Sequence, residues 1–74
     1  MSTQREWVWP YWSAYVGADG SVSWSNHEQK ASKSQSGKDF LANGPDKVVA
    51  SSVPSRVARE MRVVVSELLK GRRR

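Results

Sequence analysis

The apolar positions in the first third of the chain follow the period-two pattern of β-strands. Segment 7–16 carries large apolar side chains on both faces of such a strand, and segment 21–25 alternates serine with Val22 and Trp24. Between the two segments stands Asp19-Gly20, a dipeptide typical of tight hairpin turns. The pattern therefore predicts a β-hairpin over residues 6–25.

The length of the hairpin loop decides which face is buried, because a shift by one residue turns every side chain to the other face. We favour a three-residue loop with Gly20 in the left-handed conformation, which sets Val16 opposite Val22. The core face is then Val8, Trp12, Ala14, Val16, Val22 and Trp24. The opposite face carries Trp7, Trp9, Tyr11 and Tyr15. A loop of two or four residues exchanges the two faces.

Segment 7–16 holds five of the seven aromatic residues, so the face outside the core needs an explanation. Segment 26–46 can fold over it, a protein partner can bind it, or unpaired bases can stack on it. Pro10 adds a constraint, because a residue without an amide hydrogen makes the first strand an edge or breaks it into two pieces.

The centre of the chain is polar, and Ala31 is its one apolar residue between Asn26 and Asp39. We expect a polar loop or a short helix over 26–39, the helix being capped by Asn26 and Gln29. The chain returns to the core at Phe40, turns at 43–46, and then carries a valine-rich segment. This segment predicts a short third strand over 46–51.

The apolar residues of the last third follow the helical period. Pro54 suits a first helical turn and Gly71 a helix end, which predicts a helix over 54–70 and a basic tail over 71–74. Apolar side chains gather on one side of this helix. The complete order predicts a single small α+β domain over residues 1–74. Its antiparallel sheet, made of the hairpin and the third strand, is packed by one C-terminal amphipathic helix.

Few residues in the 74-residue chain suit catalysis or metal binding. It has no cysteine and one histidine, His27, so a thiolate zinc site or a disulfide cannot form. The acids are scattered except for Glu60 and Glu67, which we expect to pair with Arg56 and Lys70. We therefore expect a non-enzyme without cofactor or metal. With no segment near the roughly 20 apolar residues of a membrane span and no signal-peptide pattern, we expect a cytoplasmic protein.

The formal net charge is +5, and seven of the twelve Lys and Arg residues lie in 56–74. On a helical wheel the four cations within the predicted helix share one side, with the acids at its margin, and the other three form the basic tail. A helix dipole favours cations near its C-terminus by about 0.3–1 kcal/mol each, so a solvated face without a ligand is one interpretation. Contact with phosphate is a second interpretation, and contact with an acidic protein surface is a third. The nucleic-acid contacts expected on this basis are Arg56, Arg59, Arg62, Lys70, Arg72, Arg73 and Arg74.

The leading hypothesis is a small basic binding module that acts on DNA or RNA, or within a nucleoprotein complex. The alternative is a small inhibitor or adaptor that binds a protein through Trp7, Trp9, Tyr11 and Tyr15. Phage-encoded inhibitors of host nucleic-acid machinery, anti-CRISPR proteins among them, include chains of this size. A homodimer formed through the strand edge near Pro10 is a third expectation.

Overall fold

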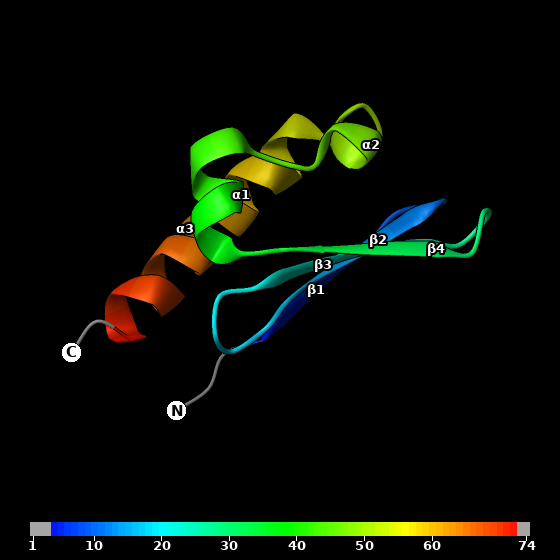
Figure 1. The fold of residues 1–74 in the computed structure, drawn as a ribbon. Coiled ribbons are helices and arrows are strands. Elements are labelled where there is room, and N and C mark those ends of the chain that lie inside the picture. The colour runs from blue at the N-terminus through cyan, green and yellow to red at the C-terminus, as the bar shows by residue number, and fades with distance from the viewer. Residues whose placement is uncertain (1–3, 73–74) are drawn as a thin grey trace.

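A four-stranded antiparallel sheet carries three helices on one of its faces (Figure 1). The computed structural model describes residues 4–72. The strands follow one another in space as in sequence, and they are β1 (Arg5–Val8), β2 (Trp12–Val16), β3 (Val22–Asn26) and β4 (Ala31–Gln35). The helices are α1 (Gly37–Asn43), α2 (Lys47–Ala50) and α3 (Ser55–Arg72). The predicted α+β class is confirmed, and none of the helices within residues 4–72 lies over the opposite face of the sheet.

The hairpin of β2 and β3 has the predicted register, with Val16 opposite Val22. Gly20 has a φ of 86° and its amide donates to the Gly17 carbonyl at 2.9 Å. The Asp19 carboxylate accepts a hydrogen bond from the Ser21 amide at 3.0 Å, and this contact within the loop stabilises its conformation. Five of the six expected core residues of this face are buried, namely Trp12, Ala14, Val16, Val22 and Trp24.

The first strand breaks into two pieces at Pro10, as one of the two expectations for this proline had it, and the face assignment was wrong for residues 7–9. The chain reverses through Pro10, where the Trp9 amide donates to the Trp12 carbonyl at 2.7 Å. After this turn β2 runs antiparallel to β1, with Trp7 opposite Ala14 and Val8 opposite Ser13. Odd residues of β1 therefore share a face with even residues of β2.

The reversal exchanges the two faces of the first segment. Val8, expected in the core, is 71% exposed on the uncovered face of the sheet. Trp7 and Trp9, expected outside, are half-buried and pack against the core. Of the four expected outer aromatics, only Tyr11 and Tyr15 remain exposed.

The polar segment 26–39 contains a strand and a helix start, where a loop or a short helix was expected. Asn26 accepts from the Gln29 amide at 2.8 Å, as a cap would, but the contact closes the turn between β3 and β4. Lys30 completes that turn with a φ of 52°. Ala31 is the one apolar residue of β4. Ser32 and Ser34 face solvent, whereas on the inward side Gln35 accepts from the buried Trp24 and Lys33 pairs with the half-exposed Asp46.

The third strand expected at 46–51 is also wrong, because these residues form α2. The Asp46 carboxylate accepts from the Val48 amide at 2.9 Å and caps the helix. This cap outweighs the weak strand preference of two valines. Val49 is buried against the sheet, whereas Val48 on the other side of α2 is 57% exposed.

The C-terminal helix is confirmed, since α3 spans Ser55–Arg72 against the expected 54–70. Val57, Met61 and Val65 lie one or two turns apart and are buried against the sheet and α1. Among residues 4–72, no helix has both the length and the apolarity needed to cross a membrane.

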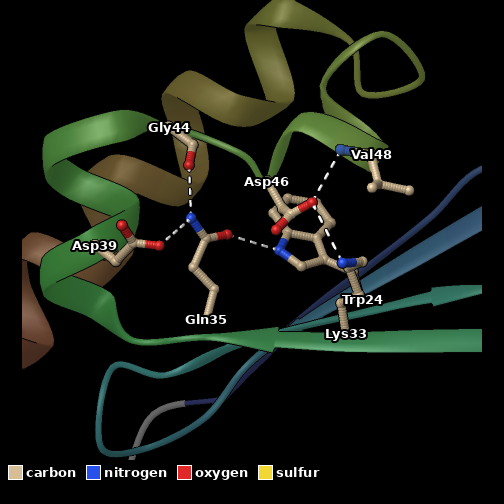
Figure 2. Close-up of polar contacts among 7 residues, drawn as sticks. All are labelled: Trp24, Lys33, Gln35, Asp39, Gly44, Asp46 and Val48. Atoms are coloured by element: carbon tan, nitrogen blue, oxygen red, sulfur yellow. Dashed lines mark hydrogen bonds and ion pairs between the residues drawn. The ribbon is translucent and has the colours of Figure 1, made fainter.

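A polar cluster around Gln35 connects the sheet to the helix layer (Figure 2). Trp24 is fully buried, and its indole N–H donates to the Gln35 side-chain oxygen at 2.9 Å. The Gln35 amide nitrogen donates to Asp39 at 3.0 Å and to the Gly44 carbonyl at 2.7 Å. A single side chain thus ties β3, β4, α1 and the loop that leads to α2.

We expect Gln35→Met to lower the free energy of unfolding by about 1–3 kcal/mol, because it leaves the buried Trp24 N–H without an acceptor. Gln29→Met is the matched control, since the Gln29 side chain is exposed in the turn between β3 and β4. Urea denaturation followed by circular dichroism compares the two variants. Equal midpoints would show that the cluster does not stabilise the fold.

Candidate nucleic-acid interface

The side of α3 that faces away from the sheet carries a row of cations. Arg56, Arg59, Val63, Ser66 and Lys70 follow a spacing of three and four residues, which keeps them on one line of the helix. Arg56 and Lys70 stand about 21 Å apart along the helix axis, at 1.5 Å per residue. We call this row the outer stripe. Its three cations are exposed, and Val63 among them is 61% exposed.

Arg62 lies at the α1 side of the outer stripe and is held in place. Its guanidinium Nη1 donates to the Leu41 carbonyl at 3.4 Å, a long hydrogen bond, and its carbon lies 6.0 Å from the centre of the Phe40 ring. The guanidinium Nη2 lies beside Gly44, where an added Cβ would stand 3.4 Å away, an ordinary van der Waals distance. Arg62 is therefore a cation positioned by α1, unlike the freely projecting Arg56.

A shallow hollow of about 320 Å³ separates α3 from the segment that carries α2. Its walls combine apolar side chains with two of the expected phosphate-binding arginines. The lining residues are Pro45, Ala50, Val53, Ser55, Ala58, Arg59 and Arg62. We call it the arginine hollow. Arg59 belongs both to this hollow and to the outer stripe, so the two features are continuous.

Among the described residues, no ion pair joins Arg56, Arg59, Arg62 or Lys70 to an acid. The ion pair found there joins Lys33 to Asp46 at 3.8 Å, on β4 and the loop before α2. Glu60, which we expected to pair with Arg56, instead accepts from the Trp7 indole N–H at 3.2 Å. The positive charges of the outer stripe are thus available to an anion from solution.

The remaining expected phosphate contacts lie in the basic tail. Arg73 and Arg74 fall outside the described residues, as does the side chain of Arg72. The structure consequently brings together Arg59 and Arg62 at the hollow, and places Arg56 and Lys70 toward the two ends of α3.

The aromatic residues do not join the outer stripe. Trp7 sits under α3 at the edge of the sheet, with the Arg5 guanidinium 5.4 Å from its ring centre. Tyr15 is 39% exposed on the uncovered face of the sheet, and Tyr11 is 58% exposed in the turn after Pro10. The uncovered face of the sheet and the helix layer that carries the outer stripe therefore lie on opposite sides of the molecule (Figure 1).

The uncovered face is rich in hydroxyl groups. In each strand the side chains that alternate with the buried positions point here, and the register aligns them in two rows across the sheet. One row is Val8, Ser13, Ser25 and Ser32, and the other is Glu6, Tyr15, Ser23 and Ser34. We call this surface the serine face. The alternation of serine with Val22 and Trp24 predicts the β3 part of this face, whereas its β4 part was not predicted, although Ser32 and Ser34 also alternate with period two.

A second shallow hollow, of about 380 Å³, lies at one end of the serine face. Three serines of one row line it with residues of the turn between β3 and β4, including His27 and Lys30. His27 is exposed. Within residues 4–72, no three histidine, cysteine or acidic residues are grouped closely enough to hold a metal ion.

Comparison with protein-family models, with curated proteins and with solved structures finds no match for this chain. The α+β arrangement by itself supports no function, since such folds carry many unrelated activities. The case for a function therefore depends on the surfaces described above.

Proposed function

We propose that this protein is a small non-enzymatic module that binds DNA or RNA, alone or within a nucleoprotein complex, through backbone phosphates. The observation that supports the proposal is the outer stripe of α3 with its unpaired cations. Phosphates repeat along a nucleic-acid strand, so a row of cations over about 21 Å along the helix can contact several of them at once. A nucleic-acid ligand also supports a cytoplasmic location.

The charge distribution of α3 favours phosphate over a simple solvated face. Surface charges chosen only for solubility are normally mixed in sign. On α3 the acids Glu60 and Glu67 lie together on one margin, whereas the cations occupy the outer side. Such a surface attracts polyanions, and it contacts the backbone without selecting a base sequence.

The salt dependence of binding tests this proposal. With Arg56, Arg59, Arg62 and Lys70 in contact, the logarithm of the association constant for duplex DNA should fall with the logarithm of salt concentration at a slope of roughly −3 to −4. Arg56→Gln removes one contact, so we expect the slope to shrink by about one unit. Fluorescence anisotropy of labelled DNA and RNA at several salt concentrations measures both slopes.

The matched control is Lys30→Gln, which removes the same charge from the turn between β3 and β4, beside the serine face. It should leave the slope close to that of the wild type. Binding that is insensitive to salt, or equal losses in both variants, would rule out the outer stripe as the phosphate-binding surface.

A protein-binding function is the second candidate, and the serine face favours it. Exposed Val8 and Tyr15 stand among serines there, a composition used by binding surfaces that combine aromatic area with adaptable hydroxyl groups. The surface differs from the four aromatics first expected, because Trp7 and Trp9 turn toward the helices. An inhibitor or adaptor of nucleic-acid machinery, of the phage type, would use this face.

The double variant Val8→Ser and Tyr15→Ser tests the second candidate. Both side chains are exposed, so we expect the fold and the binding of DNA to stay unchanged while retention of a protein partner falls. Affinity capture with the wild type, the double variant and Arg56→Gln compares the two surfaces, and sedimentation shows whether the partner is a second copy. Equal capture by the wild type and the double variant would exclude the serine face.

A further inference from the structure

The arginine hollow combines two kinds of surface that a bare phosphate group does not need. Arg59 and Arg62 supply two guanidinium groups, and Ser55 supplies a hydroxyl. The rest of the lining is apolar and comes from Pro45, Ala50, Val53 and Ala58. Phosphate oxygens gain nothing from such a wall, whereas the flat face of a base or a sugar gains contact area on it.

Arginine suits both parts of a nucleotide. Its planar guanidinium forms paired hydrogen bonds with phosphate oxygens, and its flat face stacks on an aromatic ring. Two arginines beside an apolar wall therefore fit a phosphate together with the base attached to it. A hollow of about 320 Å³ holds roughly one such unit.

The Arg62 side chain makes its own contacts with α1. Its contacts with the Leu41 carbonyl and the Phe40 ring hold the guanidinium over α1. Gly44 has a φ of 78°, which favours glycine, and its carbonyl accepts from Gln35. The cluster around Gln35 thus fixes the chain beside the hollow, and less side-chain freedom is lost when an anion binds.

We propose that the arginine hollow binds one unpaired nucleotide, so that the protein prefers single-stranded to double-stranded nucleic acid. The inference rests on the proposed function and adds to it a preference for single-stranded nucleic acid. In a duplex the bases are stacked and paired, so their flat faces are not available to a pocket on a protein surface. In a single strand, one base enters the hollow while its neighbours' phosphates follow the outer stripe from Arg59.

Filling the hollow provides the test. Ala50 is exposed at the end of α2 and lines the hollow, so Ala50→Phe occupies it without removing a cation. Val48→Phe is the matched control, because Val48 lies exposed on the same helix and is not part of the lining. Circular dichroism first establishes that both variants fold as the wild type does.

Anisotropy titrations then use a labelled oligonucleotide of mixed sequence as a single strand and as a blunt duplex at one salt concentration. We expect the wild type and Val48→Phe to prefer the single strand by about fivefold or more, the lower range for one stacked base. Ala50→Phe should bring the single-strand affinity down to the duplex level. Equal affinities for both strand types in the wild type would overturn the inference.

The outcomes separate this inference from the proposed function. Salt-sensitive binding without strand preference would leave the outer stripe intact and exclude the nucleotide site. If no strand binds in a salt-sensitive way, both the proposed function and the nucleotide site are excluded. If Ala50→Phe fails to fold, amide shifts of the wild type on addition of a nucleoside monophosphate replace it. Shifts at Ala50, Val53 and Ser55 that inorganic phosphate does not cause support the site.

The alternative ligand of the hollow is a segment of a protein, because an acidic peptide also carries anionic and apolar groups. A peptide of alternating acidic and aromatic residues is therefore added to the preformed complex with the single strand. Displacement by this peptide at lower concentrations than by a nucleoside monophosphate would overturn the inference. Displacement in the opposite order supports it.

Discussion

The hydrogen bond between Trp24 and Gln35 is the contact on which the arrangement of both layers depends. Trp24 is the largest fully buried side chain, and its indole N–H must find an acceptor between sheet and helices. Gln35 supplies that acceptor at the end of β4 and uses its own amide hydrogens on Asp39 and Gly44. The position of α1, and of the loop that begins α2, therefore follows from the burial of one tryptophan.

Local patterns predicted the elements whose own residues determine them. The hairpin of β2 and β3 follows from Gly20 and from alternation, and α3 follows from apolar residues at helical spacing. Most of the failures involve partners distant in sequence or a reversal, and the exception is α2, whose Asp46 cap is local. Besides Ala31, the inward side of β4 carries Gln35 and Lys33, which pair with Trp24 and Asp46. No pattern within 26–39 reveals such partners.

The same distinction explains how much of the candidate site was predictable. The positions of Arg56, Arg59 and Lys70 on one side of α3 follow from helical periodicity alone. The arginine hollow does not, because one of its walls belongs to α2, a segment whose valines favoured a strand. The predicted aromatic surface was wrong for a geometric reason. A reversal at Pro10 exchanges the two faces, so Trp7 points toward α3 while Val8 points away from it.

The two candidate functions use surfaces on opposite sides of the molecule. The outer stripe and the arginine hollow lie on the helix layer, whereas the serine face lies on the far side of the sheet (Figure 1). The serine face carries Glu6 as its one charged side chain, so it offers little attraction to phosphate. A ligand on one surface does not cover the other. Nucleic-acid binding and protein binding are therefore compatible in this fold, and a protein that uses both would act as an adaptor between the two.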